Sequence, residues 1–109
     1  MITYTTNQYG LRQKDMAYMT RLFEGVTTLE KAVLYGSRAM GNFEKGSDID
    51  LALVGEKLTG REIAHIHAML EEESPTLLGF DVLHYDTLKN EALKSEIDMH
   101  GKIIYLSKA

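Results

Sequence analysis

Two aspartates, Asp48 and Asp50, stand one residue apart at the start of the apolar run 48-DIDLALV-54. Alternate side chains of a strand share one face, so we expect the two carboxylates to project together, with Cα atoms roughly 6.5 Å apart. Carboxylates this close repel each other, and a proton, a cation or a divalent metal relieves the repulsion. Mg²⁺ accepts one or two carboxylates together with waters and substrate phosphates. The pair therefore predicts a site for a hard metal ion, against the alternative of two ordinary turn or capping residues.

Ten residues separate the pair Gly36-Ser37 from Asp48. Gly36 would let the backbone approach a ligand closely, and Ser37 is a good N-cap for a short helix over 38–41. The free N–H groups at such a helix start attract phosphates. Together the two motifs predict a nucleoside triphosphate held by backbone N–H groups at one end and by metal at the other.

A P-loop is excluded for the same stretch. The segment 36-GSRAMG-41 has the G-x-x-x-x-G spacing, but Asn42 and Phe43 stand where Lys and Ser/Thr are needed. The lysine that would reach the terminal phosphates is therefore missing.

Hydrophobic patterns predict four helices and four strands around these residues. The expected helices cover about 11–25, 38–41, 61–73 and a segment capped by Asp86 or Thr87 that ends near His100, and the expected strands cover 31–36, 48–54, 79–85 and 102–106. Gly101 stands where a left-handed C-cap residue is expected. Strands that alternate with helices predict an α/β fold, with helices packed on a sheet. The length of 109 residues predicts a single domain over 1–109.

Composition limits the classes of partner. With 16 acidic and 12 basic residues the net charge is −4, which is the wrong sign for a broad basic face, so no direct nucleic-acid binding is expected. A nucleotide ligand stays open, because metal ions bridge acidic side chains to phosphates. The N-terminus lacks the pattern of a signal peptide, no apolar run reaches the ~18 residues of a membrane helix, and cysteine is absent. We therefore expect a cytoplasmic protein that makes no contact with a membrane.

The spacing Gly36-Ser37, ten residues, Asp48-x-Asp50 resembles the motif of the DNA polymerase beta-like nucleotidyltransferase superfamily, and most closely its minimal nucleotidyltransferases. The flanks agree, since the family commonly reads GSRARG and SDIDL, and only Met40 departs from a basic residue. The resemblance implies the nucleotidyltransferase fold, a mixed sheet of about four strands packed with helices. It also requires a third carboxylate on a neighbouring strand. Asp81 is preferred over its competitor Asp86, because Asp86 lies at the strand end, where it would cap the next helix.

By this resemblance the reaction is transfer of a nucleoside monophosphate, AMP from ATP, to an acceptor hydroxyl with release of pyrophosphate. Asp48, Asp50 and Asp81 would hold two Mg²⁺ ions, with Asp81 also taking the acceptor's proton. Gly36 and Ser37 would hold the triphosphate. Arg38, the next residue, would add charge to it, with an exposed and merely solvated arginine as the alternative.

The resemblance also implies a partner. Minimal nucleotidyltransferases of the antitoxin type pair with helical HEPN-type toxins and add AMP to a tyrosine of the toxin. An acceptor surface is accordingly expected from another protein or from a second copy of this chain. Two alternatives stay open: a catalytically silent module that neutralises its partner by binding, and nucleotidyl transfer to a small molecule or a tRNA end.

Overall fold

The computed structural model describes residues 6–108. Its elements follow the alternation expected from the sequence. They are α1 (Gln13–Glu24), β1 (Lys31–Tyr35), α2 (Gly36–Met40), β2 (Ile49–Val54), α3 (Gly60–Glu73), β3 (Phe80–His84), the 3₁₀ turn η1 (Tyr85–Thr87), α4 (Glu91–His100) and β4 (Lys102–Leu106). Within this range no helix is long and apolar enough to cross a bilayer.

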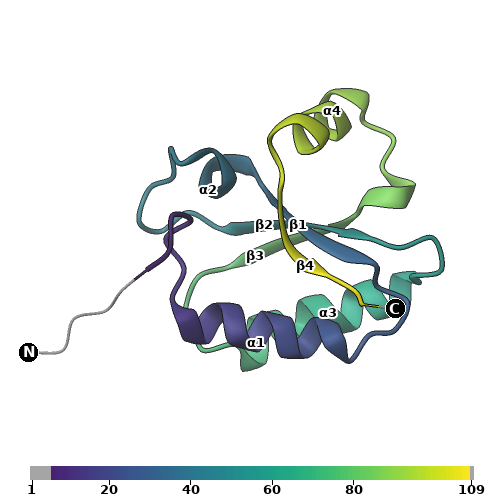
Figure 1. Cartoon of the computed structure of the whole chain (residues 1–109), viewed down its shortest axis with the longest axis horizontal. Helices are drawn as coiled ribbons and strands as arrows, with labels where there is room; N and C mark the ends of the chain where they lie inside the picture. The colour runs from purple at the N-terminus through teal and green to yellow at the C-terminus, as the bar shows by residue number, and fades with distance from the viewer. Residues whose placement is uncertain (1–5, 109) are drawn as a thin grey trace, which may run out of the picture.

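The four strands form one mixed sheet in the order β3-β2-β1-β4. β1 pairs antiparallel with β2 and with β4, whereas β2 pairs parallel with β3. Helices α1 and α3 cover one face of the sheet, and α2 and α4 lie on the other (Figure 1). The expectation of a mixed four-stranded sheet in an α/β fold is confirmed.

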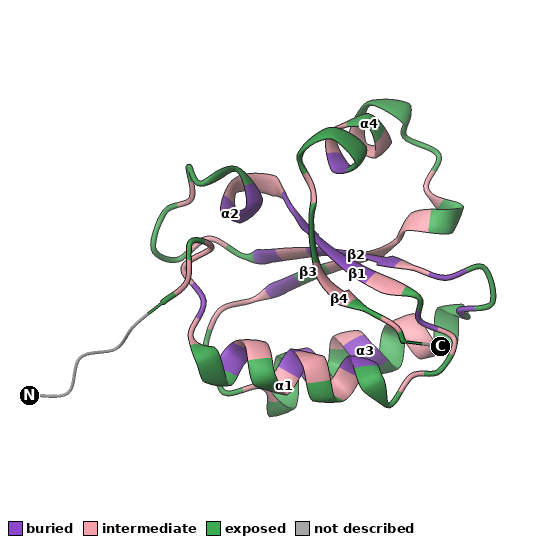
Figure 2. Cartoon of the chain, viewed as in Figure 1, coloured by how far each residue is buried: buried purple, intermediate pink, exposed green. Residues whose placement is uncertain are grey.

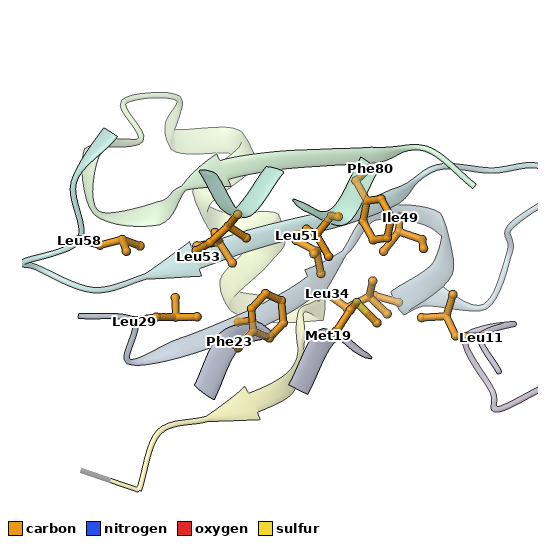
Figure 3. Packing of buried hydrophobic residues seen from close by; sticks show 14 residues of the cluster. Leu11, Met19, Phe23, Leu29, Leu34, Ile49, Leu51, Leu53, Leu58 and Phe80 are labelled. Atoms are coloured by element: carbon orange, nitrogen blue, oxygen red, sulfur yellow. The ribbon is translucent and has the colours of Figure 1, made fainter. Parts of the chain in front are cut away.

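The larger core lies between the sheet and helices α1 and α3 (Figure 3). Met19 and Phe23, one helical turn apart on α1, are almost fully buried there, as the 3.6-residue period of the apolar positions predicts. β2 contributes Ile49, Leu51 and Leu53, each 0% exposed. Because strand side chains alternate, Asp50 and Ala52 point to the opposite face, where Ala52 packs in a smaller cluster with Ile97 of α4.

Burial along the chain follows this layering (Figure 2). Eight of the eleven residues of the two central strands, β1 and β2, are buried, whereas the outer faces of the helices are exposed and the edge strand β4 is exposed or half-buried. Leu106 of β4 is 65% exposed. The two motifs thus adjoin the buried centre of the sheet.

Three local predictions about helix ends were wrong. Ser37 is not an N-cap, because α2 begins at Gly36 directly after β1 and has no side-chain cap. The last helix is capped by Asn90, whose side chain accepts from the Leu93 N–H, while the segment containing Asp86 forms η1. Gly101 follows α4 in an extended conformation, with φ −64°, and not in a left-handed one. A Cβ at Gly101 would lie 2.5 Å from the Ile97 carbonyl oxygen and from Val33, so close packing explains the glycine.

Candidate active site

Sheet pairing brings two of the expected carboxylates side by side. Asp50 on β2 and Asp81 on β3 are register partners in the parallel pair, and Tyr35 on β1 is the partner of Asp50 on its other side. Asp48 directly precedes β2, which begins at Ile49, one residue later than expected. Asp50 is half-buried, whereas Asp48 and Asp81 are exposed. The carboxylates therefore lie around the point where β2 and β3 begin and β1 ends.

The charges of these residues act on one another. Burial raises the pKa of Asp50, and the negative charges of Asp81, then Asp48 and Glu96, raise it further, while Arg38 opposes them. Tyr35 is buried beneath the same charges, and its pKa is raised by burial and by Asp81 and Asp50. The electrostatics thus describe one negative site with Asp50 at its centre.

Glu96 is a residue that the sequence did not single out. It lies on α4, and its negative charge raises the pKa of both Asp50 and Tyr35. No motif marks it, because it is one of several acidic residues on that helix. Only the packing of α4 against β1 and α2 brings it near the site.

Gly36 connects the two motifs in space. Its φ of +73° is a left-handed conformation that favours glycine. A Cβ placed on Gly36 would collide with the Oδ2 atom of Asp50. The Gly-Ser end of the motif and the second aspartate are therefore in contact, as the prediction of a shared site requires, and Ser37 follows in the first turn of α2.

Asp48 has a comparable glycine neighbour that the sequence analysis missed. A Cβ on Gly79 would lie 2.8 Å from the Asp48 Oδ1 atom. The Gly79 carbonyl oxygen also accepts the Ile49 N–H at 2.9 Å. The position of a glycine at the start of the third predicted strand is the signal that could have found it.

Arg38 differs from the alternative of an exposed, merely solvated arginine. It is 1% exposed, and its guanidinium donates to the backbone oxygens of Tyr9, Lys45 and Ser47. Its Cζ also lies 4.7 Å above the ring of Phe43. The alternative of an exposed, solvated arginine was wrong, because the loop between the motifs folds around the guanidinium and uses its donors.

Asp86 is occupied elsewhere. Its Oδ1 atom accepts the Gly55 N–H at 2.8 Å and lies 3.4 Å from His84 Nε2. This carboxylate therefore holds the connection after β2 in place. Asp81, by contrast, is the strand partner of Asp50.

The donors suit a hard cation in their chemistry. Within the described part of the chain, no group of three or more His, Cys, Asp or Glu side chains is arranged so that it could hold a metal ion, so the expected three-carboxylate set is not preassembled. The like charges that raise the pKa of Asp50 would nevertheless be relieved by a cation. Mg²⁺ needs only one or two carboxylates, because waters and phosphates complete its shell.

A model of a known protein family matches most of the chain. The family model described as "Polymerase beta, Nucleotidyltransferase" matches residues 19–109, which include both motifs and all four strands. Among curated proteins, none matches the chain in sequence at a significant level.

Three solved structures of toxin–antitoxin complexes contain a chain with the same fold. One, a toxin–antitoxin with AMP-PNP, aligns with a TM-score of 0.66 at 18% identity over 94% of this chain and 76% of that chain. The toxin–antitoxin MntA-HepT gives 0.65 at 17% identity over 89% and 74%. The tri-AMPylated HEPN toxin of Shewanella oneidensis in complex with MNT antitoxin gives 0.64 at 17% identity over 88% and 73%. At these identities the likeness is one of fold.

Proposed function

This chain belongs to the polymerase beta nucleotidyltransferase family, and on that premise we propose that it is a Mg²⁺-dependent enzyme that transfers AMP from ATP to a hydroxyl group of a partner protein. The observation that carries the proposal is the contact between the two motifs. The backbone of Gly36 abuts the carboxylate of Asp50, and Asp81 stands beside Asp50 in the sheet. A triphosphate held at Gly36 and Ser37 would therefore reach the carboxylates directly.

Each residue has a role in this proposal. Asp48, Asp50 and Asp81 would hold two Mg²⁺ ions, which would supply positive charge to the phosphates and to the attacking and leaving oxygens. Gly36 and Ser37 bind the triphosphate through their backbone N–H groups. These residues orient the α-phosphorus toward the acceptor.

The bond changes follow from that arrangement. The acceptor oxygen forms a bond to the α-phosphorus, and the bond from that phosphorus to the bridging oxygen breaks, so that pyrophosphate leaves. The acceptor hydroxyl gives its proton to Asp81. Asp81 suits this role, because it is exposed at the edge strand β3 and can meet an incoming protein side chain.

We assign the acceptor to a HEPN-type toxin, with a tyrosine hydroxyl as the reacting group and this chain as the antitoxin. The support is that chains of the same fold occur in toxin–antitoxin complexes, one with AMP-PNP and one with a tri-AMPylated HEPN toxin. Tyrosine presents a hydroxyl at the end of a rigid ring, which can reach a site formed by surface carboxylates. ATP is the substrate that supplies AMP.

The experiment incubates this protein with a HEPN-type protein encoded beside its gene, ATP and Mg²⁺, and measures the intact mass of that second protein. We expect a gain of one or more AMP units, lost on addition of EDTA and in Asp48→Asn and Asp50→Asn. Asp86→Asn is the matched control, because its carboxylate lies outside the site, and it should label the partner normally.

Two results would count against the proposal. A partner that gains no mass from the wild-type protein would exclude AMP transfer to it. Equal neutralisation of the toxin by the wild type and by Asp50→Asn would show that binding alone, and not transfer, silences the partner.

A further inference from the structure

Residues 7–11 form a closed turn ahead of α1, outside the residues 19–109 that the family model matches. We propose that this turn is a positioning element of the active site, and that Arg38 is the residue through which it acts. Figure 1 shows the N-terminal segment, in purple, beside the loop that follows α2. The part of this inference that concerns catalysis rests on the proposed function; the part that concerns the loop does not.

The turn is closed by its own hydrogen bonds. The Asn7 Oδ1 atom accepts the N–H groups of Tyr9 and Leu11 at 2.9 and 3.0 Å. In the backbone, Asn7 N–H donates to the Leu11 oxygen at 2.8 Å and Gly10 N–H donates to the Asn7 oxygen at 2.9 Å. Leu11 is 1% exposed and belongs to the main core (Figure 3). The turn is therefore anchored to the body of the domain at one end.

Arg38 joins the turn to the loop between the motifs, residues 42–47. Its Nη1 atom donates to the Tyr9 oxygen at 2.9 Å. Its Nε and Nη2 atoms both donate to the Ser47 oxygen, at 3.0 and 2.8 Å, and Nη2 also donates to the Lys45 oxygen at 3.3 Å. Ser47 immediately precedes Asp48, so the guanidinium fixes the backbone from which that carboxylate projects.

The turn lies directly on this arginine. A Cβ at Gly10 would lie 2.5 and 2.7 Å from two ring atoms of Phe43 and 2.8 Å from the Arg38 Nη1 atom. Gly10 also has a φ of +72°. The backbone of the turn thus packs against the stacked side chains of Arg38 and Phe43. A shift of the turn would therefore disturb these two side chains.

Asp48 needs this support more than the other carboxylates do. Asp50 and Asp81 lie within paired strands, whereas Asp48 precedes β2 and follows an irregular loop. A buried guanidinium has a fixed fork of donors, so it holds several carbonyls in one geometry. The backbone of Asp50 and Asp81 is held by hydrogen bonds between strands, whereas the loop before Asp48 is held by hydrogen bonds from Arg38.

The test compares three variants with the wild-type protein. Gly10→Ala forces an added carbon against Phe43 and Arg38. Asn7→Ala opens the turn without adding an atom, and it keeps the test valid if Gly10→Ala does not fold. Gly41→Ala is the matched control, because Gly41 has a similar φ of +84° and no atom within 4 Å of an added Cβ.

Two experiments are made: hydrogen–deuterium exchange of peptides covering residues 42–48, and steady-state kinetics that give kcat and KM for AMP transfer from ATP. We expect Gly10→Ala and Asn7→Ala to speed exchange in that segment and to lower kcat by up to about 100-fold, with less change in KM for ATP. Gly41→Ala carries a comparable left-handed strain without the added contacts, so its exchange is the reference for strain alone, and its kcat should stay near the wild-type value.

The outcomes separate this inference from the proposed function. Exchange in 42–48 that matches Gly41→Ala would overturn it, and so would faster exchange with an unchanged kcat, since the turn would then have a structural role alone. If the wild-type protein transfers no AMP, the proposed function fails, and exchange in 42–48 alone decides whether the turn positions the loop.

Discussion

Comparing Gly36→Ala with Gly41→Ala separates the effect of backbone strain from the effect of displacing a carboxylate in the site. Gly36 has a φ of +73°, and its added Cβ would collide with the Asp50 Oδ2 atom. Gly41, at the other end of α2, has a φ of +84° with no atom within 4 Å of an added Cβ. Gly36→Ala and Gly41→Ala therefore share the strain of a left-handed L-residue, and only the first displaces a carboxylate.

The expected sizes follow from these contacts. A left-handed conformation costs an L-residue about 1–2 kcal/mol, which is the whole effect expected for Gly41→Ala. In a domain of this length each kcal/mol lowers Tm by about 4–8 °C. Gly36→Ala has the same cost plus the displacement of Asp50, so its free energy of unfolding should fall further. Movement of a reacting group by about 1 Å can lower the rate on the order of 100-fold.

The assays are thermal denaturation and AMP transfer from ATP, on both variants and the wild-type protein. Gly41→Ala should lose stability and keep its kcat at a temperature where it is folded. Gly36→Ala should lose stability and transfer together. The reasoning is refuted if the two variants lose the same stability and Gly36→Ala still transfers AMP at the wild-type rate, because the contact between Gly36 and Asp50 would then have no consequence.

Two further predictions concern the carboxylates. The folded-state pKa of Asp50 is raised, by burial first and then by Asp81, so its ionised form destabilises the fold above the unfolded-state pKa. Denaturation in EDTA should therefore show that Asp50→Asn is more stable than the wild type at neutral pH, and that this difference vanishes as the pH falls through the folded-state pKa to below the unfolded-state pKa. A difference in stability that stays constant with pH would contradict this prediction. Asp86→Asn keeps an oxygen that accepts the Gly55 N–H, so its free energy of unfolding should fall by less than about 1 kcal/mol and it should transfer AMP normally. Asp81→Asn should fold and transfer no AMP. The reverse result in intact-mass assays would assign the third carboxylate to Asp86.

The sequence predicted the elements well because their signals are local. Apolar residues at a 3.6-residue period gave α1, and apolar runs gave the four strands. The common face of Asp50 and Asp81 followed from strand alternation once β2 and β3 were paired. That pairing could be expected only from the family resemblance, since a parallel neighbour leaves no mark in the local sequence.

The errors came from tertiary contacts. An exposed Arg38 was one of two alternatives because arginine is usually exposed, and its burial depends on carbonyls of Tyr9 and Ser47 that no local pattern predicts. Gly101 looked like a left-handed cap, but packing against Val33 explains it. Glu96 joined the site only through the placement of α4. In each case at least one of the contacting elements lies far along the chain.

Two kinds of positioning meet in this site. Asp50 and Asp81 are held by strand register, and a slip of one residue would turn Asp50 toward the apolar face now filled by Leu51. The placement of these carboxylates therefore depends on the same strand pairing that stabilises the sheet. Asp48 instead depends on a loop held by a buried arginine, at Ser47. Changes in the core should thus affect fold and site together, whereas changes around Arg38 can alter the site while the sheet stays intact.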